Sequence, residues 1–272
     1  MLKITDVRKT YEDEHGRTTN ALESASLEVS EGGFVSIVGP SGCGKSTLLE
    51  IVAGLLTADS GTIEIDGDVV TEPHPVVGVV FQEDSLFPWL SVQGNVEFGR
   101  RAKGDGKSEA HERAAEMVKL VGLERFSDHY PEQLSGGMRQ RVAIARTLVT
   151  QPKVILMDEP FGALDEQTRL VLGEEVLRLW DETGSTIVFV THSLSEAAML
   201  SDRIAVMTAR PGTISEVIDV SLPRPRNSDV IGTPEFTQIT GRLWSHLHGQ
   251  AQEILSVRDE RWAEPAATGR SS

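Results

Sequence analysis

Runs of mostly apolar residues alternate with amphipathic stretches through most of the chain. Four of these runs have the length of buried strands: residues 34–38, 76–81, 154–157 and 187–190. Three stretches with helical spacing follow such runs: residues 45–53, 166–180 and 193–200. Apolar strands that alternate with helices are typical of a parallel sheet covered on both faces. The pattern therefore predicts an α/β fold with a mostly parallel central sheet.

Two parts of the chain differ from this pattern. Residues 2–11, 21–29 and 62–65 show partial alternation and many β-branched side chains, which predicts strands. From residue 92 to about 150 the spacing becomes helical. This stretch interrupts the alternation of strands and helices, so we expect an inserted α-helical subdomain at about residues 85–150.

The C-terminal part predicts two more strands, at residues 204–207 and 213–220. Residues 222–227 alternate proline with arginine and predict an extended linker. Residues 236–254 have helical spacing, and this helix is either regulatory or additional packing. The small and polar residues 265–272 predict a disordered tail.

Length and charge narrow the class of protein. The 272 residues, 39 % hydrophobic and 25 % charged, predict a globular main domain at 1–226 and a C-terminal extension, a helix and a tail, at 227–272. The net charge of −15 argues against nucleic-acid binding, because the phosphate backbone would be repelled. No uncharged stretch exceeds 13 residues, which is too short to span a bilayer, and no apolar core follows Met1, so no signal peptide is expected.

The single cysteine, Cys43, cannot form an internal disulfide, which fits a reducing cytoplasm. It lies in a glycine-rich segment where a nucleophile has no evident task. We interpret it as a small filler residue, with a redox switch as the alternative.

The glycine-rich segment carries the first candidate chemistry. Residues 39–46 read Gly-Pro-Ser-Gly-Cys-Gly-Lys-Ser between a strand and a helix, as a phosphate-binding loop requires. Backbone N–H groups and the helix N-terminus would surround a phosphate. Lys45 is expected to reach the β- and γ-phosphates, and Ser46 to bind Mg²⁺. The motif predicts a nucleoside triphosphatase with these nucleotide contacts: Gly39, Pro40, Ser41, Gly42, Cys43, Gly44, Lys45, Ser46 and Thr47.

Two further motifs complete the candidate site. Asp158 and Glu159 end an apolar strand, where Asp158 would hold Mg²⁺ and Glu159 would orient or deprotonate the attacking water. Ser135, Gly136 and Gly137 precede a helical run at 139–149, which predicts a second anion-binding helix start. The chain therefore carries two phosphate-recognising surfaces.

In this order the motifs resemble the ATP-binding subunits of ATP-binding-cassette (ABC) transporters, over about residues 2–226. The resemblance implies a P-loop ATPase fold with an N-terminal antiparallel β subdomain and the inserted helical subdomain. It also implies a head-to-tail dimer that sandwiches two ATP molecules. The Ser135-Gly136-Gly137 signature of one protomer would then contact the γ-phosphate bound by the other.

Four more residues acquire roles from this resemblance alone. Gln82 matches the glutamine that senses Mg²⁺ and links to the transmembrane partner, and His192 matches the switch histidine at the γ-phosphate. Asp165 matches a residue that crosses the dimer interface, although it could also cap the next helix. Tyr11 matches the aromatic residue that stacks on adenine, with core packing as the alternative.

Details of the sequence are similar to the nitrate, sulfonate and taurine importers. They are the Phe-Gln-Glu-Asp-Ser-Leu-Phe-Pro-Trp-Leu segment at 81–90, the turn at 209–212 and the Leu-Pro-Arg-Pro-Arg segment at 222–226. Trp89 would face a permease in this family, or would pack in the helical subdomain. Gly94 departs from the acidic residue that often precedes Asn95 in relatives.

These observations predict an ATPase that drives uptake of a small anion such as nitrate, an aliphatic sulfonate or taurine. The expected cofactors are ATP and Mg²⁺. The expected partners are a second ATP-binding subunit, identical or different, transmembrane permease subunits, and indirectly an extracytoplasmic binding protein. The expected location is the cytoplasmic face of the membrane. The alternatives are an exporter subunit for lipid or drug, and a soluble ABC ATPase of DNA repair or translation.

Overall fold

The computed structural model describes residues 1–208 and 211–262, and of residues 250–262 it describes the backbone alone. The strands are β1 (Leu2–Glu12), β2 (Thr18–Val29), β3 (Phe34–Val38), β4 (Ser60–Ile65), β5 (Asp68–Val69), β6 (Val77–Val80), β7 (Val154–Asp158), β8 (Thr186–Val190), β9 (Arg203–Met207) and β10 (Ile214–Asp219). The α-helices are α1 (Lys45–Val52), α2 (Val92–Ala102), α3 (Lys107–Leu120), α4 (Gly136–Leu148), α5 (Glu166–Thr183), α6 (Leu194–Leu200) and α7 (Pro234–Trp262). Short 3₁₀ turns are Glu124–Phe126, Pro131–Gln133 and Ser228–Gly232.

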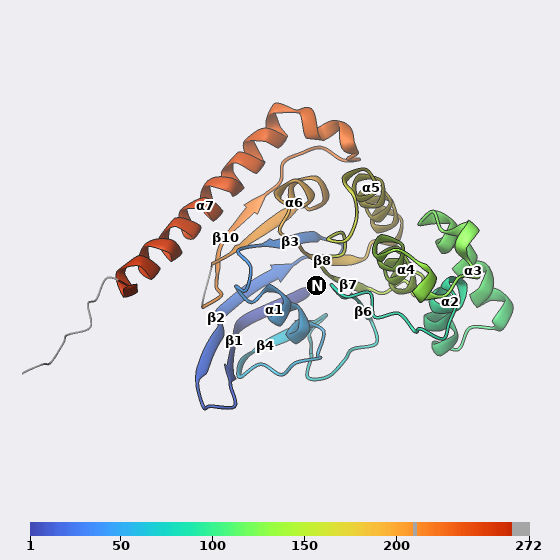
Figure 1. The fold of residues 1–272 in the computed structure, drawn as a ribbon, viewed down its shortest axis with the longest axis horizontal. Coiled ribbons are helices and arrows are strands. Elements are labelled where there is room, and N and C mark those ends of the chain that lie inside the picture. The colour runs from blue at the N-terminus through green and yellow to red at the C-terminus, as the bar shows by residue number, and fades with distance from the viewer. Residues whose placement is uncertain (209–210, 263–272) are drawn as a thin grey trace, which may run out of the picture.

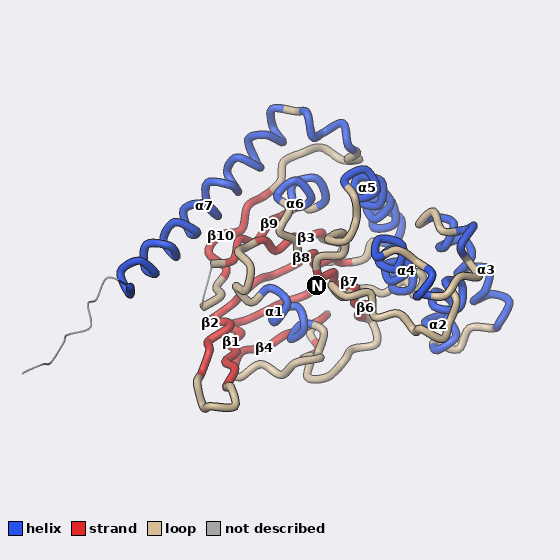
Figure 2. Tube along the Cα trace, in the orientation of Figure 1, coloured by secondary structure: helices blue, strands red, loops and turns tan. Residues whose placement is uncertain are grey.

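The strands form two sheets, with helices packed around them (Figures 1 and 2). The six-stranded sheet has the order β10-β9-β3-β8-β7-β6, and its strands are parallel except for the antiparallel pair β9–β10. The four-stranded sheet, β2-β1-β4-β5, is antiparallel. The expected parallel core and antiparallel N-terminal sheet are both present.

Strand alternation divides the apolar core into two clusters. Phe34 and Phe189 face the cluster shared with helices α2 to α7, whereas Val35 and Val190 face the cluster that includes α1 and the four-stranded sheet. Successive side chains on a strand point to opposite faces, so strands buried on both sides read as continuous apolar runs. Helix α1 lies between the two sheets (Figure 1) and thereby holds the phosphate-loop motif at their junction.

Helices α2, α3 and α4 lie together beyond the β6 edge of the larger sheet (Figure 1). Their apolar residues, such as Val96, Val118 and Val142, belong to the same cluster as the sheet. Helix α4 starts at Gly136, three residues before the expected start. The reason is local: the Ser135 hydroxyl accepts a hydrogen bond from the Met138 N–H at 3.3 Å and so caps the helix there.

The expected extended linker at 222–227 is not a free connection, because Arg226 is only 6 % exposed. Its guanidinium donates to the carbonyl oxygens of Ser201 at 2.7 Å and Leu222 at 2.9 Å. Burial lowers the pKa of Arg226 to about 10, so the group remains charged at neutral pH. The segment is therefore fastened between α6 and β10. Helix α7 then follows, and the tail predicted at 265–272 lies outside the described residues.

Candidate functional site

The phosphate-loop motif connects β3 to α1 at the carboxyl end of the parallel strands. Gly44, immediately before α1, has a φ of 98°, and a Cβ there would lie 2.7 Å from the Ala21 carbonyl oxygen. Only glycine tolerates this backbone and this close approach. The Lys45 ammonium donates to the carbonyl oxygens of Gly39 at 3.0 Å and Pro40 at 3.1 Å. The loop thus curls around the cation that would meet a phosphate.

A cavity of about 430 Å³ opens above this loop. It is lined by Tyr11, Thr19, Asn20, Ala21, Ser41, Gly42, Gly44, Lys45, Ser46, Thr47, Gln82 and Glu159. Sequence reasoning missed Thr19, Asn20 and Ala21. They belong to no motif, and they reach the cavity because β2 pairs with β1 in a register that sets Thr19 opposite Tyr11.

Cys43 packs beneath the loop and is 1 % exposed. Burial raises the pKa of its thiol, although the neighbouring Lys45 opposes the rise. A buried thiol that remains protonated is a poor nucleophile. This environment agrees with the interpretation as a filler residue.

Asp158 ends β7 beside the phosphate loop and is buried. Burial raises the pKa of its carboxyl, the Ser46 hydroxyl lowers it by hydrogen bonding, and the charge of Glu159 raises it further. Its Oδ1 atom is buried without a hydrogen-bond partner. An orphaned carboxylate oxygen next to a serine hydroxyl has the donor chemistry that Mg²⁺ takes in nucleotide sites.

Such a metal would depend on the nucleotide for its remaining ligands. Among the described residues, no group of three or more His, Cys, Asp or Glu side chains could hold an ion by itself. Mg²⁺ commonly combines one or two protein oxygens with substrate phosphates and water. Ser46, Asp158 and Gln82 suit that arrangement, and Gln82 lines the same cavity.

Glu159 and His192 meet at the end of the sheet. The Nδ1 atom of His192 lies 3.2 Å from Oε2 of Glu159. Glu159 has a φ of 45°, a left-handed conformation that is uncommon for a non-glycine residue. Its N–H donates to the Val190 carbonyl oxygen at 2.9 Å, which anchors this strained backbone to β8. Glu159 lines the cavity above the phosphate loop, whereas His192 does not line it and reaches it only through its contact with the Glu159 carboxylate.

Tyr11 lies at the mouth of the cavity and is 42 % exposed, so it is not a core residue. Its hydroxyl lies 3.3 Å from Oγ1 of Thr47, and the Lys9 ammonium lies 5.9 Å from its ring centroid. The ring is therefore held at the edge of the phosphate loop with much of its surface accessible. Such a ring offers a stacking surface for a planar base.

The signature residues Ser135, Gly136 and Gly137 begin α4 and do not line the cavity above the phosphate loop. Gly136 instead lines a separate cavity of about 390 Å³ that Gln82 also borders. Within one chain, the phosphate loop and Gly136 therefore line different cavities. Asp165 caps α5, its two carboxylate oxygens accepting from the N–H of Thr168 at 2.9 Å and from its hydroxyl at 2.7 Å. These hydrogen bonds lower the pKa of Asp165.

An aromatic patch, formed by Phe87, Trp89 and Phe98, lies next to the Gln82 loop. The Phe87 ring centroid is 5.6 Å from that of Trp89 and 4.5 Å from that of Phe98. Trp89 is 70 % exposed, which excludes the alternative that it packs in the subdomain core. Buried Asn95 holds this loop through hydrogen bonds to Phe87 in both directions, at 2.9 and 3.1 Å.

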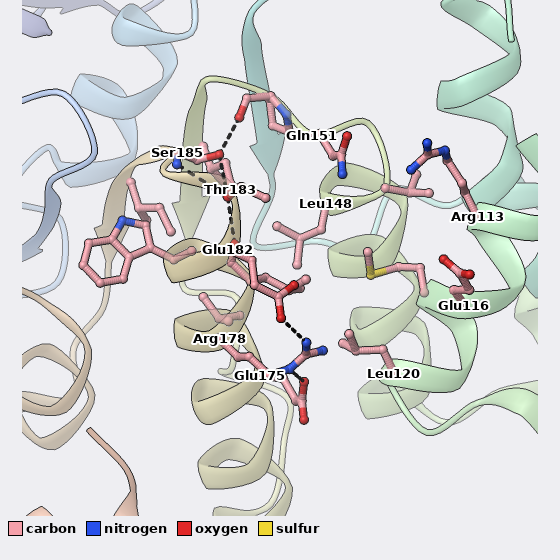
Figure 3. Close-up of a pocket in the computed structure, with 18 of the residues that line it drawn as sticks. Arg113, Glu116, Leu120, Leu148, Gln151, Glu175, Arg178, Glu182, Thr183 and Ser185 are labelled. Carbon is pink, nitrogen blue, oxygen red and sulfur yellow. Dashed lines mark hydrogen bonds and ion pairs between the residues drawn. The ribbon is translucent and has the colours of Figure 1, made fainter. Parts of the chain in front are cut away.

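A larger cavity, about 710 Å³, lies elsewhere, between α3 and α5 (Figure 3). Its rim is charged, and Arg178 is held there between Glu175 and Glu182. It contains none of the motif residues, so its size does not make it the candidate site.

Comparisons with known proteins agree with the geometry. A family model described as ABC transporter matches residues 22–162. An uncharacterised ABC transporter ATP-binding protein of Methanocaldococcus jannaschii is 50 % identical over 254 residues, 93 % of this chain and 94 % of the relative. The nitrate import ATP-binding protein NrtD of Synechocystis sp. is 43 % identical, covering 93 % of this chain and 97 % of the relative. The taurine import ATP-binding protein TauB of Rhizobium johnstonii is also 43 % identical, covering 91 % and 97 %.

Among solved structures, a dimeric post-hydrolysis state of an ATP-binding cassette bound to ADP and Pi is similar to this chain. The TM-score is 0.75 at 36 % identity, with 82 % of this chain and 100 % of the other covered. In the part of this chain that the structure describes, no helix is long and apolar enough to cross a membrane.

Proposed function

This chain belongs to the ABC transporter family, as an ATP-hydrolysing subunit of importer type, and we propose that Glu159 and His192 perform its hydrolytic step. The observation that carries this proposal is their 3.2 Å contact beside Asp158 and the phosphate loop. A carboxylate next to the γ-phosphate position can orient the attacking water and accept its proton. His192 would hold that carboxylate and contact the γ-phosphate.

The other residues of the cavity have binding roles. Backbone N–H groups of residues 41–44 and the Lys45 ammonium would hold the phosphates, and the Tyr11 ring would stack on adenine. Ser46, Asp158 and Gln82 would hold Mg²⁺, which neutralises charge on the phosphate oxygens. The unpartnered Oδ1 of Asp158 supports this assignment.

The second half of the site would come from a second subunit. Ser135, Gly136 and Gly137 do not line this chain's own nucleotide cavity, although the N-terminus of α4 suits an anion. A head-to-tail dimer would bring them to the partner's γ-phosphate, with Asp165 near the interface. The dimeric state of the solved cassette supports this arrangement.

The aromatic patch is proposed to contact a transmembrane permease. Exposed aromatic side chains that cluster at one place mark protein interfaces, and this patch adjoins the Gln82 loop. The subunit would then be peripheral on the cytoplasmic face of the membrane. An extracytoplasmic binding protein would deliver the cargo.

We propose a small anion as the cargo, of the nitrate, aliphatic sulfonate or taurine class, because relatives named for nitrate and taurine import match nearly the whole chain. Import names weigh against an exporter of lipid or drug. The net charge of −15 weighs against a soluble ATPase acting on nucleic acid.

A tagged pull-down from cells in mild detergent tests this function. We expect a multi-span permease in roughly equal amount, and genes beside that permease would narrow the cargo. Recovery of nucleic acid or ribosomes without a membrane protein would overturn the importer assignment while leaving the ATPase chemistry in place.

A further inference from the structure

An ion pair joins the loop after β6 to the start of α4. The Arg139 Nε atom donates to Oδ2 of Asp84 at 2.8 Å, and Nη1 of the same guanidinium donates to the Leu134 carbonyl oxygen at 2.8 Å. A planar guanidinium that binds a carboxylate and a carbonyl oxygen fixes the orientation of both. The accepting carboxylate, Asp84, belongs to the loop that carries Gln82. The accepting carbonyl group, Leu134, immediately precedes the signature serine, Ser135.

Two other side chains of α4, Gln140 and Arg146, also hold this loop. Gln140 donates to the Phe81 carbonyl oxygen at 3.2 Å. Arg146 donates to the Ser85 carbonyl oxygen at 2.9 Å, and its guanidinium lies 5.3 Å from the Phe87 ring centroid. The loop from Phe81 to Phe87 is therefore attached to one face of the signature helix, with the ion pair closest to the helix start.

The ion pair lines the second of two cavities that share Gln82. One is the nucleotide cavity above the phosphate loop, and the other is lined by the loop, Gly136, Arg139 and Gln140. A displacement of the loop at Gln82 would thus be opposed by the same contact that orients the turn at Ser135. The ion pair therefore connects the loop of Gln82, which belongs to this chain's proposed nucleotide site, with the Ser135–Gly137 turn, which is proposed to serve the partner's site.

We propose that Asp84 and Arg139 are positioning residues that fix the signature turn relative to Gln82, so that each nucleotide site sets the geometry offered to the other. The roles of Gln82 and Ser135 in this inference rest on the proposed function. Neither positioning residue contacts the reacting atoms in this arrangement. Both act by holding the Ser135–Gly137 turn in place.

Hydrogen exchange of the full chain without nucleotide tests the ion pair directly. Asp84→Asn should accelerate exchange of the amides at 134–138 about three- to tenfold, because the turn loses its charged anchor. Arg139→Gln should do the same, and the double variant should be no faster than the faster single variant. Asp84→Glu, which keeps the negative charge, should exchange the amides at 134–138 as slowly as the unaltered chain does. Glu83→Gln, an exposed acid of the same loop, is the matched control.

Unchanged exchange at 134–138 in Asp84→Asn, or effects of the two single variants that add in full, would overturn the proposal. ATP turnover gives a second readout: Asp84→Asn should lower kcat at unchanged affinity of the monomer for ATP. A fall in kcat as large in Glu83→Gln would count against a specific role for Asp84. Failure of the unaltered chain to bind ATP would defeat the proposed function instead, and the exchange comparison would still decide the ion pair.

Discussion

The Nδ1 atom of His192 and the Oε2 atom of Glu159 lie 3.2 Å apart, although 33 residues separate them in the sequence. Each residue follows one of two neighbouring parallel strands, whose ends are aligned because Asp158 pairs with Val190. The carboxyl ends of parallel strands meet at one edge of the sheet, where α/β proteins place their ligands. The hydrolytic chemistry proposed for this chain depends on that shared edge.

Glu159→Gln should lower ATP turnover by a factor of about 10² to 10⁴, because the amide cannot accept the proton of the attacking water. ATP binding should persist, since the phosphate loop and Asp158 are unchanged. The unhydrolysed nucleotide should then trap a dimer. Turnover and size-exclusion chromatography with ATP measure both effects, with Glu166→Gln, an exposed acid at the start of α5, as the control. Rapid hydrolysis by Glu159→Gln would contradict the role of this residue.

Asp158→Asn should raise the thermal stability of the nucleotide-free protein at neutral pH and abolish Mg²⁺-dependent ATP binding. Burial raises the pKa of Asp158, so the folded state holds a proton that the unfolded state releases. Stability from this group is therefore greatest below the ordinary carboxyl pKa and is lost as pH rises through the raised pKa. The substitution removes that loss.

Thermal melts across the acidic to neutral range, with and without Mg–ATP, measure the Asp158 effect. The unaltered chain should lose more stability with rising pH than Asp158→Asn does, and Mg–ATP should stabilise the unaltered chain but not Asp158→Asn. Asp219→Asn changes an exposed acid of β10 and is the control. Parallel pH profiles for the unaltered chain and Asp158→Asn would contradict the buried-charge argument.

Ser135→Arg should leave ATP binding to the monomer intact and prevent formation of the ATP-bound dimer. The serine hydroxyl caps α4, and a large cation in its place would obstruct the approach of the partner. Nucleotide titration and sizing in the Glu159→Gln background separate the two properties. A closed dimer of the Ser135→Arg protein would rule out the contact across protomers.

Arg226→Met should lower the free energy of unfolding by about 3 kcal/mol, because buried carbonyl oxygens at Ser201, Val220 and Leu222 lose their donor. Methionine retains apolar volume, so the loss would report mainly on hydrogen bonding. Denaturant unfolding measures it, and Arg17→Met, in the exposed β1–β2 hairpin, should change little. Equal stability of the two variants would contradict a structural role for Arg226.

Trp89→Asp should reduce recovery of the permease in the pull-down while leaving the ATP affinity of the isolated subunit unchanged. The indole is 70 % exposed, so its removal would not open a cavity in the core. Trp244→Asp, which alters another exposed tryptophan, on α7, is the matched control. Undiminished permease recovery with Trp89→Asp would move the proposed interface away from the aromatic patch.

The sequence was sufficient for features whose physical cause is local. Nearly continuous apolar runs predicted β3, β7 and β8 to within a residue, because strands buried on both faces favour apolar residues at most positions. The phosphate loop was recognisable for a similar reason, since its glycines and Lys45 act through the backbone of one short segment. The alternation of strands and helices then indicated a parallel sheet.

Only the tertiary structure decided which distant residues meet. Sheet register set His192 beside Glu159 and Thr19 opposite Tyr11, and helix packing joined Asp84 to Arg139. The exposure of Trp89 and the burial of Arg226 likewise depend on what surrounds them. Periodicity reports which face of an element is apolar, and it carries no record of the element that covers that face. Contacts between distant segments therefore required the packed fold.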